Sequence, residues 1–312
     1  MTGAVTEDSN QGERSRPRLL LLGALALLLA ACGGTEEGTT AIQPARDGRL
    51  PRFSHVIVVV EENRNYGSAI GGTEMPYLDS LAGAYGLATQ YHANTHPSIG
   101  NYFMLTTGRV VTNDDGFSGT VSGDNIVRQL VAAGLTWKAY AEDLPSVGYV
   151  GGGSGTYARR HNPLSYLTDV VNDSAQRRNI VPFTQFATDL QRDSLPSYAF
   201  IVPNLCNDAH DCRLSMADAW LHANIAPLIA SPTFQRDGLL IITFDEAGSD
   251  DAGGGGRVAW VVVSPKAKRG YRSAAWYQHE STLRLTAEAL GLTHFPGASA
   301  TASNMAEFFE GQ

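Results

Sequence analysis

One run of apolar residues stands out in the pattern of hydrophobic and polar positions along the chain. Residues 55–60 contain five consecutive apolar positions, four of them valine. An apolar run without alternation is typical of a strand buried on both faces, in a parallel or mixed sheet covered by helices. The run ends abruptly at Glu61, Glu62 and Asn63. Because open α/β sheets bind ligands at the carboxyl ends of such strands, these side chains indicate a binding site; the simpler explanation is the beginning of a solvated loop.

A second apolar run repeats this arrangement and favours the binding site. Residues 239–244 predict another buried strand, which ends at Asp245 and Glu246. Two buried strands that each deliver acid or amide oxygens at their carboxyl ends can share one hard cation. The alternative is a structural ion pair between these acids and Arg64 or Arg257.

The remaining pattern predicts a single three-layer α/β/α sandwich with a central, mainly parallel sheet. Three further segments have the pattern of strands, and six have the spacing and the Gly or Pro boundaries of helices. The expected strands are 136–140, 198–202 and 258–263, and the expected helices are 75–85, 98–107, 124–133, 182–190, 216–230 and 277–290. His222, within the helix at 216–230, is interpreted as structural.

Ser98 falls at the N-terminus of the expected helix 98–107, and two interpretations of it are open. Free backbone N–H groups and the positive end of the helix dipole make that place suited to a phosphate group. The alternative is that the Ser98 side chain only caps the helix.

Three histidines are candidates for catalysis or ligand binding. His161 follows Arg159 and Arg160, a local positive patch that suits an anionic substrate, although a solvated loop is the commoner explanation for paired arginines. His210 lies in the polar loop after the expected strand 198–202, and His279 lies in the first turn of the last long helix.

The N-terminal residues resemble a bacterial lipoprotein signal peptide. Three arginines precede a short apolar run at residues 19–29, which is followed by Ala30, Ala31 and Cys32. We expect cleavage before Cys32 and a lipid on its sulfur, which would anchor the protein to a membrane of the cell envelope. The alternative is an ordinary signal peptide with an incidental cysteine. The expected organisation is a signal peptide at 1–31, a flexible tether at 32–52 and one folded domain at 53–312.

Charge and the remaining cysteines extend this picture. The formal net charge of −8 disfavours a nucleic-acid surface, so no nucleic-acid partner is expected. In an oxidising compartment outside the cytoplasm, Cys206 and Cys212 are expected to form a local disulfide.

Several short motifs, taken in order, resemble the bacterial phosphoesterase family of exported acid phosphatases and phospholipases C. That family belongs to the alkaline-phosphatase-like superfamily, and the resemblance covers about residues 53–293. One departure is Gly100, where relatives commonly carry Pro. The matching motifs are Glu62-Asn63, Thr95-His96-Pro97-Ser98-x-x-Asn101-Tyr102, Tyr157-x-x-x-His161-Asn162-Pro163, Pro203-Asn204-x-Cys206-x-Asp208-x-His210, Thr243-Phe244-Asp245-Glu246 and the helix that begins near His279.

The resemblance implies a role for each matching residue. It implies that Ser98 is the nucleophile, that His161 and His210 bind the phosphoryl group, and that His279 is a further catalytic member. Asn63 is expected to contact both substrate and metal. The metal-binding set implied by the resemblance is Glu62, Asn63, Asp245 and Glu246. These oxygen ligands are expected to bind one divalent ion. Ca²⁺, Mg²⁺, Mn²⁺ and Zn²⁺ are all compatible with them.

The expected function is an exported, metal-dependent phosphomonoesterase, an acid phosphatase that acts on a phosphate-ester substrate through a phosphoserine intermediate. The first alternative is a phosphodiesterase of phospholipase C type, which the length of 312 residues disfavours. The second is a non-catalytic, lipid-anchored protein that binds phosphate or metal. Ser98 disfavours this alternative, because a protein that only binds does not need a nucleophile.

Overall fold

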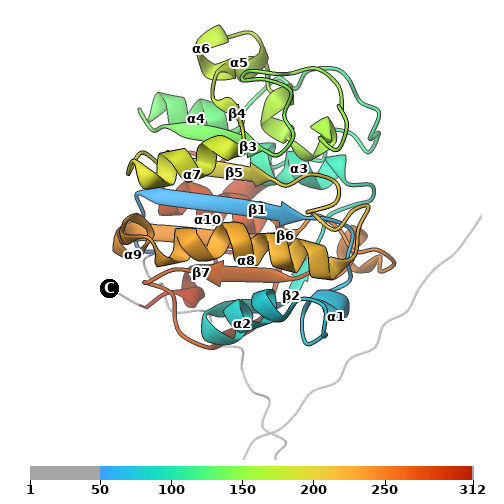
Figure 1. Cartoon of the computed structure of the whole chain (residues 1–312), viewed down its shortest axis with the longest axis vertical. Helices are drawn as coiled ribbons and strands as arrows, with labels where there is room; N and C mark the ends of the chain where they lie inside the picture. The colour runs from blue at the N-terminus through green and yellow to red at the C-terminus, as the bar shows by residue number, and fades with distance from the viewer. Residues whose placement is uncertain (1–49, 311–312) are drawn as a thin grey trace, which may run out of the picture. The chain divides into compact units, whose positions relative to one another are not determined.

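The computed structural model describes residues 50–310, which fold around one eight-stranded sheet with helices on its two faces (Figure 1). The expected signal peptide at 1–31, the lipidation site Cys32 and the expected tether up to residue 49 lie outside the described residues. Leu50 packs against the hydrophobic core of the domain. Within residues 50–310, no helix combines the length and apolar character that crossing a membrane requires.

The sheet places the first strand of the domain near its centre. Its strands are β1 His55–Glu61, β2 Gly86–His92, β3 Trp137–Ala141, β4 Ile180–Pro182, β5 Tyr198–Val202, β6 Gly238–Phe244, β7 Trp260–Val263 and β8 Tyr271–Gln278. They lie in the order β4-β3-β5-β1-β6-β7-β2-β8. β1 is parallel to its neighbours β5 and β6, and only β7 is antiparallel to the strands beside it. The predicted α/β architecture with a mainly parallel central sheet is confirmed.

Helices cover the sheet in two outer layers. The α-helices are α1 Tyr66–Ala69, α2 Pro76–Ala84, α3 Ile99–Thr107, α4 Ile126–Ala132, α5 Thr168–Val171, α6 Ser174–Arg177, α7 Thr184–Gln191, α8 Leu214–Ala230, α9 Pro232–Asp237 and α10 His279–Ala289. Short 3₁₀ helices are η1 Arg159–His161, η2 Pro163–Tyr166, η3 Ala252–Gly254, η4 Gly297–Ala300 and η5 Ala306–Phe308. Figure 1 shows α7, α8 and α9 in front of the sheet and α10 behind it. α3 packs against α10 and belongs to the rear layer.

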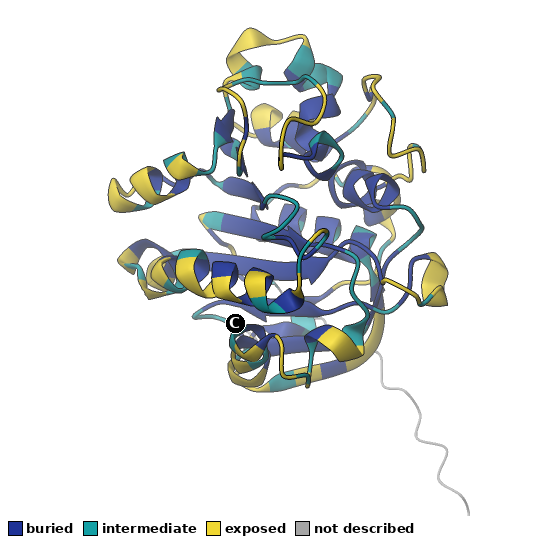
Figure 2. Cartoon of the chain, turned by 45° about the vertical axis from the view of Figure 1, so that its right-hand side comes forward, coloured by how far each residue is buried: buried dark blue, intermediate teal, exposed yellow. Residues whose placement is uncertain are grey.

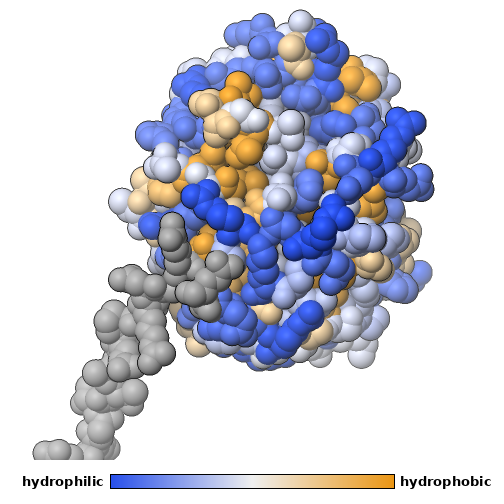
Figure 3. All heavy atoms as spheres, turned by 90° about the vertical axis from the view of Figure 1, so that its left-hand side faces the viewer, coloured by the Kyte–Doolittle hydropathy of each residue, from blue (hydrophilic) through white to orange (hydrophobic). Residues whose placement is uncertain are grey.

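The central strands form the core, as their apolar composition predicts. Every residue of β5, β6 and β7 is buried, and so is every residue of β1 after His55. Figure 2 shows the central strands buried and exposed residues on the outer sides of the helices. Burial of each large aliphatic side chain stabilises the fold by about 1.5–3 kcal/mol, which is why continuous apolar runs mark the centre of such a sheet. The face at the amino ends of the parallel strands is mainly hydrophilic, with apolar groups between (Figure 3).

The five expected strands are all present, and three further strands were not predicted. β2 and β8 pair at one end of the sheet and mix polar with apolar residues, and β4 has only three residues. Short or half-exposed strands carry a weak periodic signal. β4 and β8 also explain why two expected helices begin later than predicted, at Thr184 instead of residue 182 and at His279 instead of residue 277.

Candidate active site

The two acidic strand ends meet at one edge of the sheet. β1 and β6 are adjacent and in register, so that Glu61 pairs with Phe244. The backbone N–H of Asp245 donates to the carbonyl oxygen of Glu61 at 2.9 Å. The residues that follow, Glu62 and Asn63 on one strand and Asp245 and Glu246 on the other, therefore lie together. The predicted convergence of the two strands is confirmed.

Asn63 turns the chain immediately after β1 and ties the two acidic ends together. Its φ of 53° lies in the left-handed region, which asparagine tolerates better than most residues. Its backbone N–H donates to Asp245 Oδ1 at 3.0 Å, and its side-chain amide donates to Glu62 Oε2 at 3.0 Å. The strained turn thus holds one carboxylate from each strand.

Ser98 immediately precedes α3 and points its hydroxyl group into this acidic site. The side chain makes no capping hydrogen bond to the helix; instead, Oγ donates to Glu62 Oε2 at 3.1 Å. The interpretation of Ser98 as only a helix cap therefore does not describe its side chain. The first N–H of the helix, that of Ile99, donates to Asp115 Oδ1 at 3.1 Å, so a carboxylate holds the place suggested for phosphate.

The loop before Ser98 is fixed by side chains from the same segment. Asn101 Oδ1 accepts hydrogen bonds from the backbone N–H groups of Asn94 and Thr95, and its amide returns a bond to the Thr95 carbonyl. A β-carbon on Gly100 would come within 2.6 Å of Thr95 and 2.5 Å of the Asn113 side chain. A β-carbon here would force the Thr95 and Asn113 side chains to move, so glycine fits the close packing of this loop.

His161 and His210 lie beside Glu62, held by one aspartate. His161 Nδ1 is 3.0 Å from Asp208 Oδ2, and the backbone N–H of His210 donates to Asp208 Oδ1 at 2.8 Å. The ring centroids of the two histidines are 5.7 Å apart. His161 Nε2 lies 3.1 Å from Glu62 Oε1 without hydrogen-bond geometry. Burial lowers the pKa of His161 well below its usual value, and the charge of Arg160 adds to this effect.

Two residues without a predicted role complete the contacts of Glu62 and Glu246. The Tyr102 hydroxyl donates to Glu62 Oε1 at 2.5 Å, and its ring stacks on His161 with a centroid distance of 5.2 Å. His96 Nδ1 lies 2.8 Å from Glu246 Oε2. Together with Asp208, Tyr102 and His96 occur in the motifs of the sequence, but only the fold shows what they contact.

His279 lies behind the site and not among the groups that face Ser98. Its side chain is fully buried, with Nε2 2.6 Å from the backbone oxygen of Asp245 and Nδ1 3.1 Å from the Tyr91 hydroxyl. Burial lowers the pKa of His279 to about 4, so the neutral ring donates through Nε2 and accepts through Nδ1. This geometry suits a positioning role for the Asp245 turn.

The site concentrates buried negative charge. Burial raises the pKa of both Glu62 and Asp245 well above the usual range; repulsion from Asp245 adds to the effect on Glu62, and repulsion from Glu246 adds to that on Asp245. Burial also raises the pKa of Glu246 and of Asp208 to about 7 each. Carboxyl groups so close together and so little hydrated need protons or a cation.

The donor set fits a divalent cation. Among the described residues, Asp245 Oδ2 is buried without a hydrogen-bond partner, as an unused ligand atom would be. One group of the described residues has the spacing of metal ligands, with ligand atoms within 4.8 Å of one another: Glu62, His161 and His210. It shares Glu62 with the set predicted from the resemblance and differs in the other members. Oxygen-rich and mixed oxygen–nitrogen sites favour different ions, so the ion is not identified.

The alternative of a structural ion pair does not hold in this structure. Arg64 donates to the backbone oxygens of Ala209 and Cys212, and the Arg257 guanidinium stacks on Tyr66. Among the described residues, neither arginine forms an ion pair with Asp245 or Glu246.

The predicted disulfide between Cys206 and Cys212 is present. It closes the loop that carries Asp208 and His210, next to the carboxyl end of β5. Arg64 binds the Cys212 carbonyl at 3.0 Å, which attaches this loop to the turn after β1. The disulfide thus joins the two ends of the loop that carries His210, and Arg64 holds that loop against the turn after β1.

The fold resembles that of proteins of the alkaline phosphatase superfamily. A solved structure described as a protein of the alkaline phosphatase superfamily from Vibrio parahaemolyticus superposes with a TM-score of 0.55, covering 80% of this chain and 70% of that one at 13% identity. At that identity the likeness concerns the fold alone.

Sequence comparison then gives the family. Residues 72–293 match the Phosphoesterase family, so this chain belongs to that family. A Phosphatidylinositol-3-phosphatase of Mycobacterium tuberculosis is 35% identical over 63% of this chain and 64% of its own length. A Probable acid phosphatase of Kluyveromyces lactis is 30% identical over 90% of this chain and 68% of its own length. The chain thus spans about two thirds of each relative.

Proposed function

We propose that this chain hydrolyses phosphate monoesters through a phosphoserine intermediate on Ser98. The observation that carries the proposal is the direction of the Ser98 hydroxyl, which donates to the buried Glu62 carboxylate and not to the helix behind it. Two imidazoles stand beside that carboxylate. The family and the two relatives named for phosphatase activity support the same reaction class.

The proposed reaction has two balanced halves. Ser98 Oγ bonds to phosphorus as its proton passes to Glu62, and the ester bond to the alcohol breaks. The imidazole of His210 gives a proton to the departing oxygen. Water then attacks the phosphoserine, its proton restores the imidazolium, and Glu62 returns a proton to Ser98 as phosphate leaves.

A bound divalent cation would assist this chemistry by lowering the pKa of the serine hydroxyl and by neutralising charge on the phosphoryl oxygens. Glu62, Asn63, Asp245 and Glu246 are the residues proposed to hold it. His161 and His210 would then orient the phosphoryl group, with Asp208 fixing both of them.

The test is rapid acid quench with phosphorus-labelled p-nitrophenyl phosphate. Label is expected on the Ser98 peptide of the parent and on no peptide of Ser98→Ala, with a loss of turnover on the order of 10⁴-fold or more. Chelation should abolish the parent activity, and a divalent ion should restore it. Near-parental turnover by the variant would mean that water attacks directly.

We also propose that the chain is exported and anchored by a lipid on Cys32. Support comes from the apolar run at 19–29, the arginines before it and the small residues directly before the cysteine. Labelled fatty acid fed to expressing bacteria should be incorporated into the parent and not into Cys32→Ser. Equal labelling of both proteins would contradict the anchor.

A further inference from the structure

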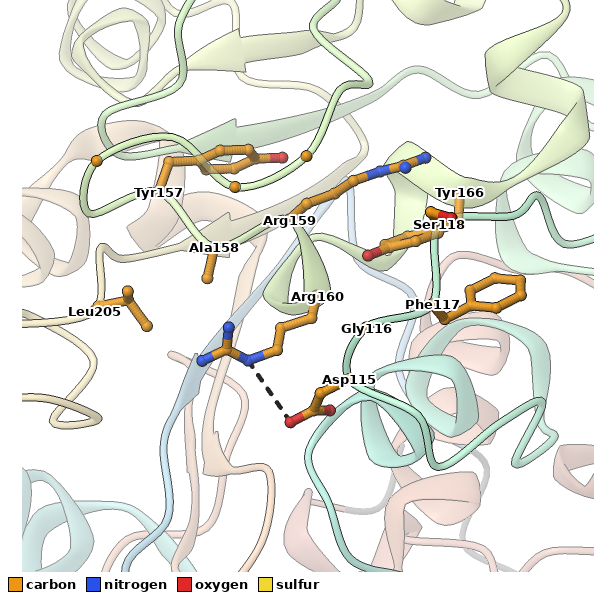
Figure 4. Close-up of a pocket in the computed structure, with 13 residues that line it drawn as sticks. Asp115, Gly116, Phe117, Ser118, Tyr157, Ala158, Arg159, Arg160, Tyr166 and Leu205 are labelled. Carbon is orange, nitrogen blue, oxygen red and sulfur yellow. Dashed lines mark ion pairs between the residues drawn. The ribbon is translucent and has the colours of Figure 1, made fainter.

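A cavity of about 390 Å³ adjoins the candidate active site and has no part in the proposed chemistry. Its volume falls within the roughly 300–1,000 Å³ range of ligand pockets. The walls come from the segment around Asp115, the glycine-rich loop at 151–155, and the segment that carries Arg159 and Arg160 (Figure 4). Glycines, aromatic side chains and the two arginines share this lining.

Arg160 forms the boundary between the cavity and the site. Its Nη2 donates to His210 Nε2 at 3.1 Å. His210 in turn belongs to the group formed with Glu62 and His161, whose ligand atoms lie within 4.8 Å of one another. A phosphoryl group bound beside these residues would therefore have its leaving alcohol within reach of the cavity that Arg160 lines.

The Arg160 guanidinium retains unused donors. Its Nε is buried and has no hydrogen-bond partner among the described residues. The nearest carboxylate oxygen, Asp115 Oδ2, is 3.8 Å away, which is an ion-pair distance but too long for a hydrogen bond. Figure 4 shows the guanidinium directed toward Asp115. A planar cation with free N–H groups is the donor that phosphate and carboxylate groups match best.

The neighbouring Arg159 is different, because its guanidinium is already engaged. Its Nε and Nη2 donate to the hydroxyl and carbonyl oxygens of Ser165 at 3.3 and 3.0 Å. Its guanidinium also stacks on the Tyr166 ring, 3.9 Å from the centroid. Arg160, by contrast, has a donor nitrogen, Nε, without a hydrogen-bond partner among the described residues.

We propose that Arg160 binds a second anionic group, carried by the leaving alcohol of the substrate within this cavity. The preferred substrates are then phosphate monoesters of polyols that bear a second phosphate or carboxylate. This inference rests on the proposed phosphomonoesterase function. Asp115 partly opposes the binding of this anion. Its negative charge repels the anion, and its carboxylate pairs weakly with Arg160.

The test compares two pairs of substrates that differ only in one carboxylate. Gluconate 6-phosphate is compared with sorbitol 6-phosphate, and 3-phosphoglycerate with glycerol 3-phosphate, by release of inorganic phosphate. In the parent, kcat/KM for the anionic member of at least one pair should exceed that for its neutral partner by about tenfold. This ratio is independent of the fraction of active protein.

Three variants separate the interpretations. Arg160→Met should bring the ratio to about one, and Arg160→Lys should recover part of it. Arg159→Met removes the same charge from the adjacent residue and should leave the ratio unchanged. Asp115→Asn keeps the oxygen that accepts the Ile99 N–H and should increase the ratio.

Two results would overturn the inference. The first is a kcat/KM ratio near one for both pairs in the parent. The second is a parental ratio in Arg160→Met, with kcat/KM reduced equally for both members of a pair. That second result would mean that Arg160 contacts the transferred phosphoryl group. Failure of the parent to release phosphate from any of the four compounds or from p-nitrophenyl phosphate would overturn the proposed function itself, a result distinguishable from the other two.

Discussion

Glu61 and Glu62 are neighbours in the sequence, yet they have opposite environments. Both side chains are fully buried. Glu62 accepts hydrogen bonds from Ser98 and Tyr102 on the α3 side of the sheet. Neither carboxylate oxygen of Glu61 has a hydrogen-bond partner among the described residues. Two adjacent glutamates therefore differ: Glu62 accepts hydrogen bonds, and Glu61 accepts none among the described residues.

The alternation of side chains along β1 is the cause of this difference, because successive residues point to opposite faces of a sheet. Burial raises the pKa of Glu61, and the charges of Asp208, Asp218 and Glu142 raise it further. Burial also raises the pKa of Glu62, but its hydrogen bonds from Tyr102 and Ser98 act in the opposite direction. Hydrogen bonds, and not burial alone, make a buried carboxylate usable for chemistry.

The largest expected effect comes from removing the charge of each glutamate in turn. Glu62→Gln should lower kcat/KM for p-nitrophenyl phosphate on the order of 10³-fold, because the acceptor for the Ser98 proton and a proposed metal ligand are both lost. Glu61→Gln is the matched control and should stay within about threefold of the parent. Equal losses in the two variants would show that the two faces are not functionally distinct.

A smaller loss is expected at the second strand end. Asp245→Asn keeps an oxygen to accept the Asn63 N–H but removes the charge, so metal affinity and activity should fall together, each by about 10²-fold. Calorimetric titration with divalent ions and the phosphatase assay measure the two quantities. Full activity of the variant after metal has been stripped would rule out the proposed metal site.

Asp208→Asn tests the support of the imidazoles and should cost roughly 10- to 100-fold in kcat. The amide can still accept from the His210 N–H, but its NH₂ group would face His161 Nδ1 and favour the other tautomer of that ring. The pH profile of kcat should change as well. Asp211→Asn, at an exposed aspartate that contacts His210 Nδ1, is the control and should have a smaller effect.

The smallest expected effect concerns stability and belongs to Glu61. Because the folded protein raises the pKa of Glu61 above its ordinary value of 4.5, the folded state holds a proton that the unfolded chain releases. The contribution of protonated Glu61 to the free energy of unfolding is therefore fully present below about pH 4.5. It is lost as the pH rises toward the folded-state pKa of Glu61. Parent stability should fall with rising pH more steeply than that of Glu61→Gln.

Urea unfolding of both proteins at pH 5 and pH 8 measures this difference. Between pH 5 and pH 8, the free energy of unfolding of Glu61→Gln should rise relative to that of the parent by about 1 kcal/mol. Other acids of the site titrate in both proteins, so only the difference between them reports on Glu61. A difference that does not change with pH would show that the Glu61 carboxyl is solvated or paired in solution.

The central strands and the acidic strand ends could be predicted because local pattern and burial agree there. Residues 55–60 and 239–244 are apolar at almost every position, and only a strand covered on both faces can bury such a run. Strands β2, β4 and β8 were not predictable, since their residues are mixed or few and they form mainly through pairing with neighbours.

Candidate site residues were identifiable one at a time, through motifs that place Ser98, His161 and His210 near the ends of elements. Their mutual contacts were not. Ser98 could have been a helix cap, and only the position of Glu62 across the sheet gives its hydroxyl a different partner. Arg159 and Arg160 look equivalent in sequence, whereas Ser165 and Tyr166 engage one of them and leave a donor free on the other.

By itself, the sequence determined which segments are buried, which strand ends carry acids and which two cysteines pair, because these follow from composition and short separations along the chain. Only the tertiary structure decided that Glu61 is isolated while Glu62 is at the centre of the site, that His279 lies behind Asp245, and that Asp208 supports two histidines. The physical reason is that hydrogen bonds between distant segments depend on the packing of α3, the β1–β6 pair and the disulfide loop, which no local pattern encodes.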